Sequence, residues 1–196
     1  MTGGHPAVKQ INVRLGEAAS EMGIALGVGS QRAAIEDRKL EDTFSAVRDA
    51  APDVPIIGNI GAVQLKRSGP EILEQLAEMI DADAIAVHLN FLQESILPEG
   101  DKDAGGVLEA LRSAAKGSVP IMVKETGAGI SREVAQDLIA AGVKMIDVSG
   151  VGGLSWAGVE SFRAAEVGDD GLEQMGRLFE NWGIPTPVSI VECKAA

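Results

Sequence analysis

Short apolar runs that stop at glycine or polar residues recur along this chain, and their spacing constrains the fold more than any other feature. At intervals of 24 to 36 residues, the runs end near six positions: Gly3, Gly29, Asn59, His88, Lys124 and Val148. One strand–helix–strand step takes about 30 residues. Segments with a helical stripe of apolar residues lie between the runs, for example at 70–80 and 131–141. The pattern predicts an α/β fold in which strands and helices alternate around a parallel sheet.

Glycine and polar residues follow at least five of the runs, which favours a TIM (β/α)8 barrel with its site at the carboxyl ends of the strands. A doubly wound sheet is the alternative, but it would gather glycine-rich phosphate binding at its first turn. A complete barrel takes about 250 residues, and this chain has 196. We therefore expect one domain, residues 1–196, that is an incomplete barrel.

Composition excludes several classes of protein. The chain is 45% hydrophobic, which is enough for one sizeable core, and it contains no apolar run of membrane-spanning length and no leader-like N-terminus. We therefore expect a cytoplasmic protein. A net charge of −12 argues against binding to nucleic acid or to an anionic membrane. One cysteine and two histidines predict that any metal is a hard cation held by oxygen ligands.

The stretch from Ala84 to Asp101 carries the densest set of functional side chains. Its first four residues are apolar, as in a strand buried on both faces, and His88, Asn90, Gln93 and Glu94 then follow within seven residues. An imidazole, two amides and a carboxylate can supply a proton-transfer group, hydrogen-bond donors and a cation ligand. The alternative is that these residues only cap the strand and line a solvated loop.

Two other run ends carry charged or anion-binding groups. In the segment 27–32, glycines leave backbone amides free to face an anion, while Ser30 and Arg32 add a hydroxyl and a guanidinium. An ordinary glycine turn is the alternative there. Lys124 ends an apolar run, so its ammonium group either points into the mouth of the barrel or reaches out to solvent.

These motifs resemble a known family. His-Leu-Asn-x-x-Gln-Glu at 88–94, followed by Pro-Glu-Gly-Asp at 98–101, closely resembles the signature of the type 2, FMN-dependent isopentenyl-diphosphate isomerases. The resemblance extends through nearly the whole chain, and it implies a (β/α)8 barrel truncated at both ends, with the first strand and the last two strands missing or incomplete. Six further motifs carry it in the same order: Met-Thr-Gly-Gly at 1–4, Gly-Val-Gly-Ser-Gln-Arg at 27–32, Gly-Asn-Ile-Gly-Ala at 58–62, Val-Lys-Glu at 123–125, Asp-Val-Ser-Gly at 147–150 and Trp-Gly-Ile-Pro-Thr at 182–186.

The resemblance implies an enzyme that interconverts isopentenyl and dimethylallyl diphosphate in isoprenoid biosynthesis. In the family, reduced FMN is thought to act as acid and base, Mg²⁺ binds the diphosphate, and NADPH serves only to reduce the flavin. The substrate is a small diphosphate, and we expect the full-length protein to be a homo-oligomer.

The resemblance also assigns residues. The catalytic residues it implies are His88, Asn90 and Gln93, and the metal ligand is Glu94. Contacts to FMN fall on seven residues: Met1, Thr2, Gly3, Ser30, Asn59, Lys124 and Ser149. Contacts to the substrate fall on Ser30, Gln31, Arg32 and Gln93.

One departure weakens the cofactor assignment. The family usually has Gly-Gly-Thr-Ser-Trp where this chain has Gly-Gly-Leu-Ser-Trp at 152–156, so Leu154 replaces a hydroxyl donor to the flavin phosphate. One lost neutral hydrogen bond costs about 0.5–1.5 kcal/mol, so FMN affinity falls unless Ser155 or a water substitutes. We expect Trp156 and Trp182 to lie in the core. Two other functions stay open: another FMN-dependent oxidoreductase of the same barrel fold, and a non-catalytic truncated remnant.

Overall fold

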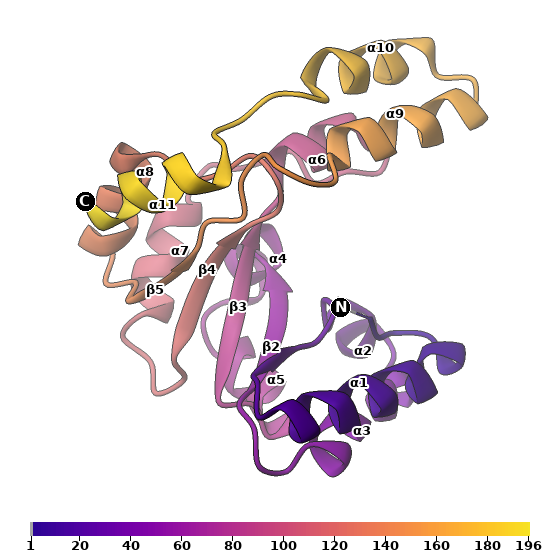
Figure 1. Cartoon of the computed structure of the whole chain (residues 1–196), viewed down its shortest axis with the longest axis vertical. Helices are drawn as coiled ribbons and strands as arrows, with labels where there is room; N and C mark the ends of the chain where they lie inside the picture. Colours follow the sequence, from indigo (N-terminus) through magenta and orange to yellow (C-terminus); the bar gives the residue numbers. More distant parts are fainter. Residues whose placement is uncertain (1) are drawn as a thin grey trace. The chain divides into compact units, whose positions relative to one another are not determined.

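The computed structural model describes residues 2–196, and it confirms the alternation of strands and helices (Figure 1). Met1, predicted to contact FMN, lies outside the described residues. The strands are β1 (Leu26–Gly27), β2 (Ile56–Gly61), β3 (Ala84–Leu89), β4 (Ile121–Glu125) and β5 (Met145–Asp147). The helices are η1 (Pro6–Val8), α1 (Lys9–Met22), α2 (Arg32–Glu36), η2 (Arg38–Leu40), α3 (Asp42–Ala50), α4 (Ala62–Ser68), α5 (Ile72–Ile80), α6 (Phe91–Ile96), α7 (Val107–Ala114), α8 (Arg132–Ala140), α9 (Trp156–Glu166), α10 (Asp170–Phe179) and α11 (Thr186–Lys194).

The strands form one sheet in the order β1-β2-β3-β4-β5. β1 and β2 pair in parallel, with Leu26 opposite Ile56 and Gly27 opposite Ile57. A strand order that follows the sequence is that of a barrel, whereas a doubly wound sheet reverses its order at a switch point. Five of the six predicted run ends correspond to these strands, and the sixth, at Thr2–Gly4, forms no strand.

The chain divides into two compact units. Unit 1 contains residues 1–87 and 109–122, and unit 2 contains residues 88–108 and 123–196. The division passes within β3 and β4, so that the carboxyl ends of both strands belong to unit 2. That residues 1–196 form one domain stays a prediction.

Unit 1 is built on a core between its first two strands and the helices that follow them. Phe44 of α3 and Ile56 of β2 are fully buried, and Ile80 of α5 and Val28 pack in the same cluster. The helical stripe predicted for 70–80 is confirmed, since α5 buries four of its apolar residues: Ile72, Leu73, Leu76 and Ile80. Burying such side chains stabilises a fold by about 1.5–3 kcal/mol each.

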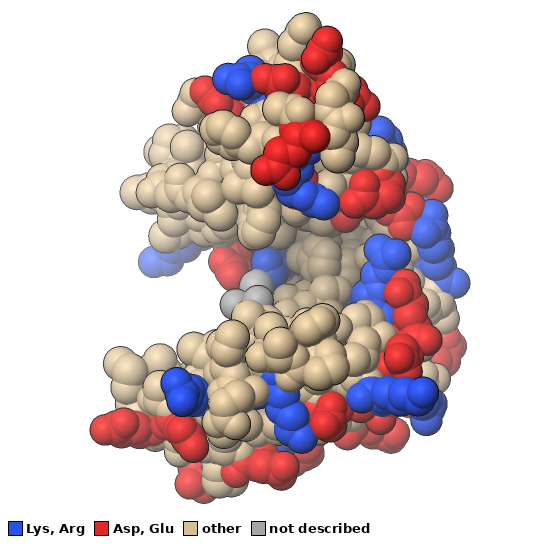
Figure 2. All heavy atoms as spheres, turned by 90° about the vertical axis from the view of Figure 1, so that its right-hand side faces the viewer, with Lys and Arg blue, Asp and Glu red and all other residues tan. Residues whose placement is uncertain are grey.

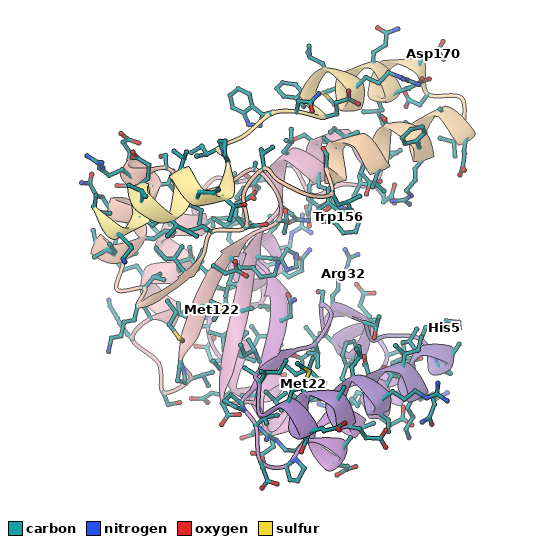
Figure 3. The ribbon with its side chains drawn as sticks, viewed as in Figure 1. His5, Met22, Arg32, Met122, Trp156 and Asp170 are labelled. Carbon is teal, nitrogen blue, oxygen red and sulfur yellow. The ribbon has the colours of Figure 1, made fainter. Side chains whose placement is uncertain are left out.

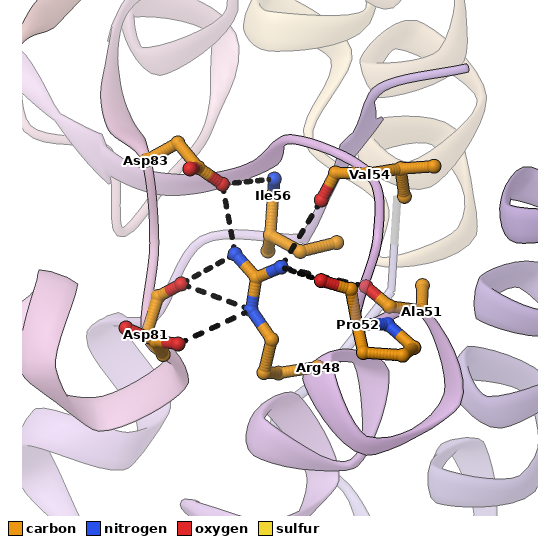
Figure 4. Close-up of polar contacts among 7 residues, drawn as sticks. All are labelled: Arg48, Ala51, Pro52, Val54, Ile56, Asp81 and Asp83. Carbon is orange, nitrogen blue, oxygen red and sulfur yellow. Dashed lines mark hydrogen bonds and ion pairs between the residues drawn. The ribbon is translucent and has the colours of Figure 1, made fainter. Parts of the chain in front are cut away.

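A single guanidinium ties together the chain segments that precede β2 and β3 (Figure 4). Arg48 donates to the carbonyl oxygens of Ala51, Val54 and Asp81, with a distance of 2.6 Å to that of Asp81, and pairs with the carboxylate of Asp83 at 2.8 Å. The same carboxylate accepts the backbone amide of Ile56 at 2.8 Å. This amide and Arg48 hold the pKa of Asp83 below its ordinary value. The cluster lies at the amino ends of the strands, so its role is structural.

Helices α8, α9 and α10 of unit 2 begin at residues whose side chains accept free backbone amides. Ser131 accepts the amide of Val134 at 3.4 Å at the start of α8, and Asp169 accepts that of Leu172 at 3.0 Å at the start of α10. Helix α11 has no side-chain cap, since Pro185 is its N-cap and Thr186 is its first helical residue.

The expectation that the two tryptophans lie in the core is also wrong. Trp156, at the start of α9 (Figure 3), is 40% exposed. Trp182 is 62% exposed. Trp182 packs edge-to-face against Phe179, with ring centroids 5.9 Å apart. Local sequence does not reveal this exposure, since an aromatic residue in a Gly-rich segment packs wherever a neighbouring element meets it.

The surface is charged on the face shown in Figure 2, where acidic and basic residues are interspersed. Within residues 2–196, no helix has the length and apolar character needed to cross a membrane.

Candidate active site

The side chains of a histidine and a lysine lie at the carboxyl ends of neighbouring strands. His88 is near the end of β3 and Lys124 near the end of β4, and both are partly buried. Burial, together with the positive charge of Lys124, lowers the pKa of His88 to about 4. The imidazole is therefore neutral near pH 7.

Lys124 sits in the same unit, and its ammonium nitrogen lies 3.4 Å from the carbonyl oxygen of Glu125. Burial lowers the pKa of Lys124, while the negative charges of Asp147 and Glu125 act in the opposite direction. A partly desolvated cation of this kind attracts a nearby anion more strongly than an exposed lysine does.

Glu94 is held at one end of α6 by its own chain. One carboxylate oxygen accepts the side-chain amide of Asn90 at 2.7 Å, and the other accepts the backbone amide of Asp101 at 2.6 Å. Gly100 makes this loop possible, because a Cβ at this position would lie 1.8 Å from the carbonyl oxygen of Glu94. The sequence motif 88–101 thus folds into one local structure that fixes a carboxylate.

Gln93 connects α6 to α9 through a buried carboxylate. Its side-chain nitrogen donates to Glu160 at 2.8 Å, and the other oxygen of Glu160 accepts Arg163 at 2.7 Å. Glu160 is only 2% exposed. A buried carboxylate needs such donors, because leaving it unpaired costs several kcal/mol, on the order of its desolvation penalty.

The loop after β4 is shaped by Glu125. One oxygen of its carboxylate accepts the backbone amides of Gly127 at 2.6 Å, Gly129 at 3.1 Å and Ala128. Gly127 and Gly129 have φ angles of +151° and +80°, which side chains rarely adopt. The loop therefore folds back on the residue next to Lys124.

Ser149, predicted to contact the flavin phosphate, has a left-handed backbone with φ of +50°. Its amide donates to Asp147 at 3.1 Å, and its carbonyl oxygen accepts the hydroxyl of Thr186 at 2.6 Å. The adjacent Gly150 allows this approach, since a Cβ there would lie 2.6 Å from the Cα of Thr186. Thr186, at the start of α11, thus fixes the loop that carries Ser149.

Leu154, which replaces the family's threonine, is 65% exposed. The hydroxyl oxygen of the adjacent Ser155 accepts the amide of Gly158 at 3.2 Å as the N-cap of α9. Ser155 therefore already has a structural role.

Among the predicted site residues that follow β1 or lie in β2, Ser30 and Arg32 are exposed, whereas Gln31 and Asn59 are buried. Ser30 follows β1 and is exposed, and Arg32 extends from α2 away from α1 and α3, where its guanidinium pairs with Glu36 at 2.8 Å (Figure 3). Both can meet a ligand. Asn59 is 3% exposed, and its side-chain nitrogen donates to the carbonyl oxygen of Val28 at 3.1 Å.

Gln31 departs furthest from its predicted role as a diphosphate ligand. Its side chain is fully buried. Its nitrogen donates to the carbonyl oxygen of Leu76 at 3.0 Å and contacts the sulfur of Met79, while its oxygen accepts the amide of Asn59 at 3.0 Å. An amide whose nitrogen and oxygen are both bonded within the protein has no donor turned to a substrate, so the geometry gives Gln31 a structural role.

Thr2 and Gly3 lie beside α1 and α3. The hydroxyl of Thr2 donates to Asn12 of α1, and the carbonyl oxygen of Thr2 accepts the amide of Gly29 at 2.9 Å. Gly3 lies against the ring of Phe44. The segment predicted to contact FMN is thus attached to the end of β1.

The donor set fits one hard cation and an anionic cofactor. Glu94 offers a single carboxylate, and the described residues contain no group of three or more histidine, cysteine, aspartate or glutamate side chains that could hold a metal. Mg²⁺ commonly binds through one or two carboxylates with substrate phosphates and water, which matches this arrangement. Lys124 and the neutral His88 supply donors suited to the anionic edge of a reduced flavin.

Sequence reasoning missed Glu160, and one signal could have revealed it. Glu160 lies on the same helical face as Ala157, Ser161 and Ala164, all of which are buried. A carboxylate within a stripe of small residues indicates a buried polar contact. Glu125, by contrast, gave no signal beyond its place next to Lys124.

The sequential parallel sheet, with functional side chains at the carboxyl ends of β3 and β4, defines an α/β protein of the TIM-barrel type. A solved structure described as "QR15, an Aldolase" shares this fold, with a TM-score of 0.52 and 19% sequence identity over 76% of this chain and 66% of that one. No protein-family model matches the chain.

Curated relatives identify the chain more closely. Over its full length it is 61% identical to an isopentenyl-diphosphate delta-isomerase of Methanothrix thermoacetophila, 56% to one of Methanococcoides burtonii and 53% to one of Halobacterium salinarum. The chain is thus homologous to the isopentenyl-diphosphate delta-isomerases along its whole length, as the sequence motifs predict. It spans about half the length of these relatives, 55% in the first case.

Proposed function

We propose that this chain forms part of the active site of a type 2 isopentenyl-diphosphate isomerase, which interconverts isopentenyl and dimethylallyl diphosphate with reduced FMN and Mg²⁺. The observation that carries the proposal is the 61% identity, over the full chain, to a protein named isopentenyl-diphosphate delta-isomerase. The type 2 assignment rests on the motif at 88–101 and on the polar groups at the ends of β3 and β4.

In this proposal, Lys124 and His88 serve the cofactor and the reacting carbons. FMN, when bound in its reduced form, supplies the acid–base groups for the allylic proton shift. Lys124 stabilises negative charge on the flavin, because it is a partly buried cation. His88 acts as a neutral hydrogen-bonding group, since its pKa of about 4 keeps it uncharged near pH 7. A neutral imidazole also avoids placing a second positive charge beside Lys124.

Glu94 binds Mg²⁺ in the proposed site. Its carboxylate is oriented by Asn90 and by the amide of Asp101, so little side-chain freedom is lost when a cation and the substrate diphosphate arrive. Each carboxylate oxygen keeps a further lone pair for the metal.

Gln93 orients the substrate while Glu160 orients Gln93. The hydrogen bond from Gln93 to Glu160 fixes the rotation of the amide group. The amide oxygen of Gln93 is then directed by that bond and is available to accept a donor. Asn90 is engaged by Glu94, so its proposed catalytic role is to hold this carboxylate as well as to line the pocket.

The wider context follows the same proposal. NADPH reduces the flavin and takes no part in turnover, the active protein is a cytoplasmic homo-oligomer, and the five strands described here belong to a (β/α)8 barrel. Ser30 and Arg32 bind the diphosphate, because both are exposed beside the amides that follow β1.

Proton NMR tests the proposal directly. The protein that contains this chain is incubated with isopentenyl diphosphate, Mg²⁺, FMN and NADPH under anaerobic conditions, and the methyl signals of dimethylallyl diphosphate are followed. We expect turnover that requires reduced flavin, and we expect Lys124→Met to abolish it while Lys144→Met, at an exposed lysine that precedes β5, leaves it unchanged. Absence of product with the unaltered protein would contradict the proposal.

A further inference from the structure

The segment Thr2–Gly4 belongs to no helix or strand, yet buried polar side chains of unit 1 hold it in place. The carbonyl oxygen of Thr2 accepts the side-chain amide of Asn12 at 3.2 Å, and the hydroxyl of Thr2 donates to the same side chain. The amide of Gly4 donates to the hydroxyl of Thr43 at 2.9 Å. Both ends of the segment are therefore bonded to helices, Asn12 in α1 and Thr43 in α3.

Asn12 and Thr43 are buried to a degree that is unusual for polar residues in helices. Asn12 is 2% exposed and Thr43 is 1% exposed. Asn12 also donates to the carbonyl oxygen of Thr43 at 2.6 Å, and the hydroxyl of Thr43 donates to the carbonyl oxygen of Leu40 at 2.6 Å. Burying such groups costs free energy unless every polar atom is bonded, and here the segment Thr2–Gly4 supplies much of the bonding.

Close contacts with Phe44 and Ala33 also restrict the conformation of Thr2–Gly4. Gly3 has φ of +147°, and a Cβ there would lie 2.0 Å from the ring of Phe44. Gly4 has φ of +80°, and a Cβ there would lie 2.7 Å from the Cβ of Ala33. The backbone therefore lies directly on these two side chains, and only glycine fits. Packing and hydrogen bonding together leave the segment one conformation.

We propose that Asn12 and Thr43 are positioning residues that hold Thr2–Gly4 in the shape that contacts the flavin. The inference rests on the proposed function, because that function makes the segment a cofactor contact. A segment that is ordered before binding loses little conformational entropy when the cofactor arrives. The hydrogen bonds of Asn12 and Thr43 to Thr2–Gly4, which we call the clamp, therefore strengthen FMN binding although neither side chain contacts FMN. Neither residue carries a charge, and both side chains are buried.

The test uses the full chain and variants that keep side-chain volume. Asn12→Leu and Thr43→Val remove the hydrogen bonds, Thr43→Ser keeps the hydroxyl, and Ala19→Gly weakens α1 at a buried position away from the segment. FMN affinity is measured by quenching of flavin fluorescence. We expect Asn12→Leu and Thr43→Val to weaken FMN binding at least tenfold, and Thr43→Ser and Ala19→Gly to stay within about threefold of the unaltered chain.

Amide hydrogen exchange at Gly4 and Gly29 gives a second readout that needs no flavin. Asn12→Leu and Thr43→Val should speed exchange at Gly4 at least tenfold while amides in β2 keep their protection. Unchanged FMN affinity in Thr43→Val, or unchanged protection of Gly4, overturns the inference. An unaltered chain that binds no FMN contradicts the proposed function and the cofactor part of the inference, whereas the exchange rates then still decide whether the clamp exists.

Discussion

The side-chain amide of Gln93 donates to the carboxylate of Glu160 over 2.8 Å, and this bond joins two residues that are 67 positions apart. Gln93 lies in α6 and Glu160 in α9, so the contact couples the functional motif to a helix that has no recognisable motif of its own. Arg163 neutralises the same carboxylate from the next turn of α9.

A double-mutant cycle tests this coupling. Gln93→Met removes one donor from the buried carboxylate of Glu160, and Glu160→Met removes the acceptor of the partly buried Gln93, whereas the double variant removes both groups. We therefore expect a coupling free energy of about 1–2 kcal/mol in urea unfolding. A parallel cycle between Gln93→Met and Asp170→Asn, at an exposed residue of α10, should give less than about 0.5 kcal/mol. Additive effects in the first cycle would show that the bond contributes nothing in solution.

The depressed pKa of His88 predicts a pH-dependent stability. The unfolded chain binds a proton at this histidine near pH 6.5, whereas the folded chain does so only near pH 4. The unfolded state therefore holds more protons between these values, and the free energy of unfolding should fall as the pH drops from about 6.5 to about 4, by up to about 3 kcal/mol.

Urea unfolding at a series of pH values measures this effect. His88→Gln should remove the decline in this window, and His5→Gln, at the exposed histidine, should retain it. An unaltered slope in His88→Gln would contradict the assignment.

Replacing the carboxylate of Glu94 should separate metal dependence from flavin binding. Glu94→Gln keeps the side-chain size but removes the charge, and its new amide group cannot accept the bond from both Asn90 and Asp101. We expect Mg²⁺-dependent turnover to fall at least 100-fold while FMN affinity changes less than threefold. The control is Glu99→Gln, because the Glu99 side chain is 68% exposed in the same loop. Turnover of Glu94→Gln that keeps its Mg²⁺ dependence would exclude Glu94 as the ligand.

The guanidinium of Arg48 should be a large local contribution to the stability of unit 1. Its side chain is 19% exposed, and Arg48→Met removes the donor of several carbonyl oxygens and leaves the Asp83 carboxylate with the amide of Ile56 but without the guanidinium. We expect a loss of about 2–4 kcal/mol in the free energy of unfolding, measured by urea denaturation near pH 7. Arg38→Met, at an arginine whose side chain is 86% exposed, should change it by less than about 0.5 kcal/mol.

Asp83 adds a pH signature to the same cluster. Its folded pKa is lowered by the amide of Ile56 and by Arg48, so its contribution to stability is present above its ordinary value of 3.8 and is lost as the pH falls further. Asp83→Asn should therefore flatten the acid limb below pH 3.8 while leaving the window between pH 6.5 and 4 to His88. Circular dichroism compares the acid unfolding of Asp83→Asn with that of the unaltered chain, and an unchanged acid limb would contradict the role of Asp83.

Local features of the sequence determined the alternation of elements and much of the candidate site. The apolar run before His88 predicts β3, whose first four residues are buried, and the apolar stripe at 131–141 predicts α8. Asn90, Glu94 and Asp101 lie within one motif, so their local structure depends on residues a few positions apart. Periodicity, capping and short loops are properties of neighbours along the chain, and they can be read without a fold.

Tertiary structure alone decided which polar side chains form their hydrogen bonds within the protein. Gln31 bonds to Asn59, 28 positions away, and so becomes part of the core, although the motif around it predicts a substrate ligand. Glu160 becomes part of the site, although no motif marks it. The exposure of Trp156 and the burial of Asn12 likewise depend on which helices meet them. The cost of burying a polar group depends on partners that are distant in sequence, and only the packed structure brings those partners within hydrogen-bonding distance.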